Sequence, residues 1–298
     1  GTESEYVFHP AEPKISDLEA TDAGCMDSVK EYSDAAVIVL GRPNVEGGDY
    51  YPGEAGIDPA TGARNPFSLT TDEKDLITFA KENFENVVIV LNSAEPFELA
   101  EEEADQDVDA ILWAGLPGHF GYTALARILD GTVNPSGKLT NLYASDTASA
   151  PAYVNFGNYF FTNADEMADG INTSSDYVVQ AEGIYEGYRY FETRYADCVM
   201  GQGNADSMTG ASDSTDGWNY SQEVVYPFGY GESYTTFDQT LDSIQVSDDI
   251  RTVTAKVTVT NTGDAAGKDA VELYASAPYY KGGVEKSAIQ LLDYAKTD

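Results

Sequence analysis

The stretch from residue 35 to residue 49 reads AAVIVLGRPNVEGGD, and it decides the fold class. Ala36–Leu40 form an apolar run of strand length that ends at Gly41. A run that is apolar at every position is typical of a strand buried on both faces, as in a parallel sheet covered by helices. Ligands of such sheets bind at the carboxyl ends of the strands. The segment after Gly41 is therefore the first place to look for a site.

This segment carries a carboxylate, Glu46, followed by two glycines that allow the backbone to approach a ligand closely. Two interpretations of Glu46 are open. It is either an acid or base of a functional site, or a solvated loop carboxylate in a chain with 51 acidic residues. We expect the loop to run over residues 41–69, and loops of this length inside compact domains are usually functional.

Helices and strands alternate around this stretch. Ser28–Tyr32 are expected to close a helix that leads into the first strand, and Thr70 with Glu73 makes a capping box for the next helix. Three helices and two further strands are expected in the order helix, strand, helix, strand, helix, over residues 71–84, 87–91, 96–103, 108–114 and 120–130. This alternation predicts a parallel sheet with right-handed crossovers, in which Trp113 is a core residue.

The pattern changes after Lys138. Residues 144–182 and 196–222 are polar and rich in Gly, Ser and Asp, and an aromatic stretch lies between them. From residue 241 onward the apolar period becomes two, a turn follows at Asn261–Gly263, and Ala270–Ala275 read as another strand. These features predict the first part of an antiparallel β-sandwich.

The composition excludes several classes of partner. The chain of 298 residues has 51 Asp and Glu against 16 Lys and Arg, a net charge of −35. Nucleic acid and anionic membrane surfaces would be repelled, whereas a neutral ligand suits a chain with 21 Tyr and 12 Phe. His9 and His119 are the only histidines, so a zinc site or a Ser-His-Asp triad is hard to build. We expect no metal and no cofactor. Cys25 and Cys198 do not make a disulfide framework.

Seven segments in this order resemble glycoside hydrolase family 3, in the part that lies outside its catalytic barrel. They are residues 42–49 (RPNVEGGD), 87–93 (VVIVLNS), 108–115 (VDAILWAG), 134–139 (NPSGKL), 182–191 (EGIYEGYRYF), 227–237 (PFGYGESYTTF) and 257–268 (VTVTNTGDAAGK). The resemblance implies a three-layer α/β sandwich with a mostly parallel sheet at residues 1–237, without its N-terminal part. It implies an incomplete all-β, fibronectin type III-like sandwich at residues 238–298. Residues 192–195 (ETRY), with the later residues 201–204 (GQGN), resemble a bacterial subgroup in which this domain precedes the barrel.

For function, the resemblance implies part of a retaining, exo-acting β-glycosidase, either a β-glucosidase, which is favoured, or a β-xylosidase. In this family the nucleophile is an aspartate on a (β/α)₈ barrel, and the general acid/base is commonly a glutamate in a Glu-Gly-x-Asp context. Only Glu46 fits that context, and no candidate for the aspartate motif occurs in the sequence. We therefore expect a chain that lacks parts at both ends, is inactive alone and needs a barrel domain or chain as its partner. Homo-oligomers are allowed, and a bacterial cytoplasm is favoured, with secretion as the alternative.

The resemblance leaves three substrate-binding candidates beside Glu46. Arg42 either orients the sugar or holds the loop by a salt bridge. Asp49 is either the charged neighbour of Glu46 or a structural cap, and Tyr50 either stacks on a sugar ring or is an exposed loop residue. The aromatic residues Tyr185, Tyr188 and Tyr230 are expected to pack rather than to bind ligand. The alternative function is a non-catalytic carbohydrate-binding or scaffold module.

Overall fold

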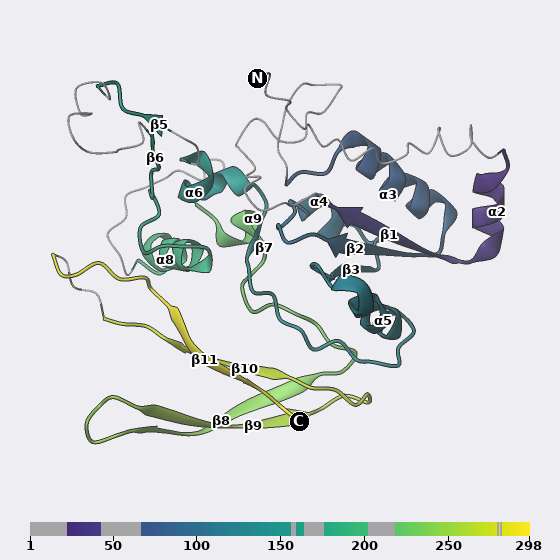
Figure 1. Cartoon of the computed structure of the whole chain (residues 1–298). Coiled ribbons are helices and arrows are strands. Elements are labelled where there is room, and N and C mark those ends of the chain that lie inside the picture. Colours follow the sequence, from purple (N-terminus) through teal and green to yellow (C-terminus); the bar gives the residue numbers. More distant parts are fainter. Residues whose placement is uncertain are drawn as a thin grey trace. The chain divides into compact units, whose positions relative to one another are not determined.

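The computed structural model describes residues 23–42, 67–155, 159–163, 176–201, 218–278, 280 and 282–298 (Figure 1). The chain divides into two compact units. The first contains residues 1–117 and 143–181, and the second contains residues 118–142 and 182–298. The predicted domain boundary between residues 237 and 238 is a different division and stays a prediction.

A parallel sheet of three strands forms the centre of the first unit. Its order is β1 (Ala35–Gly41), β2 (Asn86–Asn92) and β3 (Ala110–Trp113), and Ile38 of β1 lies opposite Ile89 of β2. Helix α2 (Cys25–Tyr32) leads into β1, and α3 (Thr71–Asn83) precedes β2 and lies along the sheet (Figure 1). The α/β class with a parallel sheet, predicted from the alternation, is confirmed.

Helix α3 begins at the predicted capping box. The backbone N–H of Glu73 donates to Oγ1 of Thr70 over 3.2 Å, and the N–H of Thr70 donates to Oε2 of Glu73 over 2.7 Å. Two orphan donors of the first helical turn are thereby satisfied. The buried face of α3 and the strands β1 and β2 supply much of the core, with the side chains of Ile38, Leu40, Ile77, Ala80, Val87, Ile89, Val90 and Leu91.

Two elements of the first unit are shorter than expected. The helix predicted over residues 96–103 is only α4, Ala100–Glu103, and the strand predicted over 108–114 is only β3. The expectation that Trp113 is a core residue is wrong, because 40% of this residue is exposed. Trp113 ends its strand, and its indole N–H donates to the carbonyl of Ser93 over 2.9 Å. The ring therefore stays at the end of the sheet, where its N–H has a partner.

Strand β1 forms one edge of this sheet. Within the described ranges it pairs with β2 alone. Ile38 and Leu40 are buried on one face, whereas Val37 and Val39 are 49% and 51% exposed on the other. Among the described residues, no strand pairs with the other side of β1, which therefore presents a row of backbone donors and acceptors beside a half-exposed apolar face.

The remaining elements of the first unit are short. They are β4 (Tyr143–Ala144), the 3₁₀ helix η1 (Thr147–Ser149), α6 (Pro151–Val154), β5 (Tyr159–Phe160) and β6 (Asp176–Tyr177). Strands β5 and β6 pair antiparallel. The polar region expected over 144–182 thus holds short elements between its loops.

The second unit combines helices with two antiparallel hairpins. Its helices are α5 (Gly118–Leu129), α8 (Tyr188–Cys198) and α9 (Tyr220–Glu223), the last of which leads into β7 (Val224–Tyr226). One hairpin pairs β8 (Phe237–Val246) with β9 (Val253–Asn261), and the other pairs β10 (Ala270–Ala275) with β11 (Gln290–Lys296) (Figure 1). The antiparallel pairing predicted from the period of two is confirmed. In the described part of the chain no helix is long and apolar enough to cross a membrane.

Three of the segments that carried the resemblance meet in the second unit. Oδ1 of Asn134 accepts the backbone N–H of Tyr234 over 2.8 Å, and its Nδ2 donates to the carbonyl of Ala266 over 3.0 Å. The ammonium group of Lys138 donates to the carbonyl of Gly231 over 2.6 Å. These bonds join segments 134–139, 227–237 and 257–268, so their side chains serve the fold.

The aromatic side chains of this unit also pack. The ring of Tyr188 stacks on Phe228 with centroids 4.4 Å apart, and its hydroxyl accepts the backbone N–H of Leu291. The ring of Tyr230 lies 5.2 Å from that of Tyr226. The prediction that Tyr188 and Tyr230 pack is confirmed, and that for Tyr185 stays a prediction.

Gly231 allows a direct test of the contact between segments 134–139 and 227–237. A Cβ atom at position 231 would overlap the carbonyl oxygen of Gly137, which is backbone and cannot rotate away. We expect Gly231→Ala to lower the free energy of unfolding by about 1–3 kcal/mol, the usual cost of overpacking. Urea denaturation measures this change. Gly137→Ala is the matched control, because its Cβ would meet open space, and an equal loss in both variants would contradict the close approach.

Candidate functional site

The structure describes the residues that directly precede and follow the segment 43–66, which carries most of the predicted site residues. Glu46, Asp49 and Tyr50 lie outside the described residues. Arg42, the fourth candidate, directly follows β1, and the described chain resumes at Phe67. The geometry of these two ends shows how the segment that carries Glu46 is attached to the sheet.

The guanidinium group of Arg42 is held on several sides. It forms a bidentate pair with Glu73, with N–O distances of 2.5 and 3.0 Å, and it donates to the carbonyls of Gly41 and Ser68 over 2.8 and 3.0 Å. It also lies 4.4 Å from the ring centroid of Phe97. The side chain of Arg42 is only 9% exposed and that of Glu73 only 1%. We call Arg42, Ser68 and Glu73 the Arg42 clasp.

Besides its pair with Arg42, the carboxylate of Glu73 has a partner at the start of its own helix. As the third residue of α3 it accepts the backbone N–H of Thr70, so its carboxylate is held at the start of the helix. The same Oε2 atom accepts from Arg42. A buried carboxylate needs such partners, because an unpaired charge in the interior costs several kcal/mol by the general estimate. The pair therefore ties the end of β1 to the start of α3.

A second carboxylate, Glu98, holds the other end of the segment. Its backbone N–H donates to the carbonyl of Phe67 over 2.9 Å, and the hydroxyl of Ser68 donates to its Oε2 over 2.5 Å. Oε1 of Glu98 accepts both the N–H and the hydroxyl of Thr147, over 2.7 and 2.8 Å. Burial, and then the charge of Glu98, raise the pKa of the nearby Tyr153 hydroxyl. Ser68 is thus held by two hydrogen bonds: its carbonyl accepts from Arg42, and its hydroxyl donates to Glu98.

Sequence reasoning identified only part of this arrangement. It named Arg42 and gave Glu73 the role of a helix cap, but it did not pair the two. It did not single out Ser68, Glu98 or Thr147 at all. Of the two roles left open for Arg42, the salt bridge that holds the loop is the one the geometry favours, since four of its five N–H donors already have protein acceptors.

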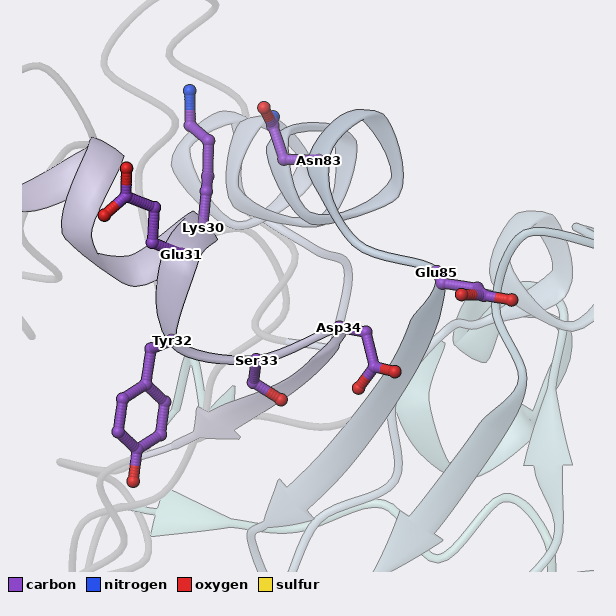
Figure 2. A pocket seen from close by; sticks show the side chains of 7 residues that line it. All are labelled: Lys30, Glu31, Tyr32, Ser33, Asp34, Asn83 and Glu85. Carbon is purple, nitrogen blue, oxygen red and sulfur yellow. The ribbon is translucent and has the colours of Figure 1, made fainter.

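A polar hollow lies at the opposite end of the strands. It is lined by Lys30, Glu31, Tyr32, Ser33, Asp34, Asn83 and Glu85, which precede β1 and β2 (Figure 2). Ligands of parallel sheets bind at the carboxyl ends instead. Across the described ranges, His, Cys, Asp and Glu side chains form no group of three or more that could hold a metal ion. We therefore do not take this hollow as the functional site.

Known proteins with the same fold identify the class to which this chain belongs. Residues 18–234 match the model of the glycosyl hydrolase family 3 C-terminal domain. Beta-glucosidase 3B from Thermotoga neapolitana, solved in complex with glucose, is similar in structure, with a TM-score of 0.65 and 29% identity over 92% of this chain and 31% of that protein. The chain belongs to glycosyl hydrolase family 3, and the family inferred from the motifs is confirmed.

Two curated relatives are similar to this chain over most of its length. Beta-glucosidase A of Butyrivibrio fibrisolvens is 33% identical over 89% of this chain, and a beta-glucosidase of Ruminococcus albus is 31% identical over 96% of it. The aligned part covers 30% and 24% of these relatives. The chain therefore spans less than a third of the length of either relative.

Proposed function

We propose that this chain is part of a retaining, exo-acting β-glucosidase and that it supplies the general acid/base, Glu46. The nucleophilic aspartate would come from a (β/α)₈ barrel domain or chain that works with it. The observation that carries the proposal is family membership together with the single Glu-Gly-x-Asp context, at Glu46–Asp49. Both curated relatives described above are named beta-glucosidases, which favours glucose over xylose as the sugar.

The chemistry assigns each carboxyl group a separate task. In a retaining glycosidase the nucleophile attacks the anomeric carbon, and the second carboxyl group protonates the leaving oxygen. The same group later removes a proton from the water that releases the sugar. Glu46 must be protonated for the first step and ionised for the second. A nearby carboxylate such as Asp49 would raise its pKa and keep the proton in place.

The attachment of the segment also supports this assignment. The segment leaves the sheet at the carboxyl end of β1, where ligands of parallel sheets bind. A group that transfers protons must be held at a fixed distance from the reacting atoms. The Arg42 clasp ties both ends of the segment to buried groups, as such a role requires.

The decisive experiment uses the protein in which this chain accompanies its barrel. Initial rates on aryl β-glucosides and aryl β-xylosides are compared for the unchanged protein and for Glu46→Ala. We expect the glucoside to be the better substrate and the variant to lose most activity on it. A variant with undiminished hydrolysis would contradict the role of Glu46 and would favour a scaffold role for the chain.

A further inference from the structure

The described residues that surround the start and end of the segment 43–66 point to a role for the clasp itself. The carbonyl of Ser68 lies 3.0 Å from a terminal nitrogen of Arg42, although the two residues are 26 positions apart in the sequence. One side chain therefore links the end of β1 to Ser68, the second described residue after the segment. Because Glu73 binds the same guanidinium group from α3, both Arg42 and Ser68 are also held relative to that helix.

We propose that Arg42 and Glu73 are positioning residues for the general acid/base. This inference rests on the proposed function of Glu46, which lies four positions after Arg42 in the sequence. The clasp fixes the position of Arg42, the residue that directly follows β1. A displacement of about 1 Å in a reacting group can cost about 10²-fold in rate. The clasp thus acts on the reaction without contact to the substrate.

The number and type of contacts argue against direct sugar binding by Arg42. Four N–H donors of its guanidinium group have protein acceptors, and one face of the group lies over Phe97. A bidentate contact to a sugar would require the pair with Glu73 to break. That would leave the carboxylate of Glu73, only 1% exposed, without its cationic partner.

The test removes the clasp while it keeps the fold. A single replacement of Glu73 would leave the buried guanidinium group of Arg42 without its carboxylate partner. We therefore choose the double variant Arg42→Met with Glu73→Gln. Replacement of a buried ion pair by neutral side chains is often neutral or stabilising. The amide oxygen that Glu73→Gln introduces can still accept the N–H of Thr70, so the helix cap is retained. Thermal unfolding checks that the protein is folded.

The readout is the dependence of kcat/KM on the leaving group. A misplaced acid harms substrates whose departing oxygen needs a proton, so we expect kcat/KM for alkyl β-glucosides to fall about 10²-fold. For dinitrophenyl β-glucoside, which leaves without much help, we expect a change of no more than about threefold. The inhibition constant of glucose should not change, because the clasp does not contact the sugar. Azide should restore part of the turnover on the dinitrophenyl substrate.

Two further variants make the result specific. Arg42→Lys keeps the charge but not the fork that reaches both Glu73 and Ser68, so we expect a smaller loss with the same dependence on the leaving group. Lys74→Met with Glu101→Gln removes an ion pair of 2.9 Å between exposed side chains, with Lys74 on the same helix, and should leave all rates unchanged.

Three results would overturn the inference. They are unchanged kinetics in the double variant, an equal loss for both substrates, and a weaker inhibition by glucose, which would place Arg42 at the sugar. Glu46→Ala is measured in parallel to separate this inference from the proposed function. If Glu46→Ala shows the dependence on the leaving group and the double variant does not, only the positioning role fails. If the loss of kcat/KM in Glu46→Ala does not depend on the leaving group, the proposed function fails.

Discussion

The purified 298-residue chain, without a barrel, is expected to hydrolyse aryl β-glucosides no faster than the uncatalysed reaction. Double displacement needs two carboxyl groups about 5–5.5 Å apart, one to attack and one to transfer protons. The chain offers a candidate for the second role and, by resemblance to the family, none for the first. A sensitive measurement is the release of a fluorescent aglycone at high protein concentration.

The control for this measurement is the same protein after the barrel has been supplied, joined or as a separate chain. Turnover should then appear and should saturate with substrate. Robust hydrolysis by the barrel-free chain, abolished by Glu46→Ala, would show that a second carboxylate lies within these residues. The proposed division of the catalytic groups would then be wrong.

Glu46→Ala in the protein with its barrel is expected to lower kcat/KM about 10²–10⁴-fold for substrates with poor leaving groups, the usual size of general acid–base catalysis. Activated aryl glucosides should lose much less in their first step, because their leaving oxygen needs little protonation. The glycosyl-enzyme should then accumulate, since the attacking water has lost its base. Added azide needs no base and should restore turnover, giving a glycosyl azide of retained configuration.

Glu54→Ala is the matched control, because it removes the same group from the same loop of the sequence. We expect it to change kcat/KM little. If Glu46→Ala lowers all substrates equally and azide has no effect, Glu46 is not the acid/base. Asp49 and Glu54 would then be the next candidates.

Local signals in the sequence were enough to predict the sheet and its first helices. The apolar runs at β1 and β2 and the capping box at Thr70 and Glu73 depend on neighbouring residues, and the structure confirms them. Helix α8 was not anticipated. It buries only Phe191 and Arg194, so its sequence shows no regular apolar stripe. The helix also begins directly after Gly187, which has a positive φ of 54°.

The clasp shows the limit of local signals for the site. Arg42 and Glu73 are 31 positions apart, and Glu98 lies 49 positions from Thr147. With 51 acidic residues in the chain, the sequence cannot indicate which carboxylate an arginine will meet. The partners depend on how α3 and the segment after β2 pack against the sheet. For the same reason the sequence did not indicate that Trp113, at the end of β3, is 40% exposed.

In the part of the chain that the structure describes, β1 has an unpaired edge, and this edge has a consequence for handling the protein in solution. Edge strands with half-exposed apolar side chains such as Val37 and Val39 can pair with other copies of the same strand. At low ionic strength the net charge of −35 keeps copies apart by long-range repulsion. At about 1 M salt the Debye length falls to about 3 Å, and this repulsion is screened. Colloidal stability thus depends on the net charge of the whole chain as well as on the strand itself.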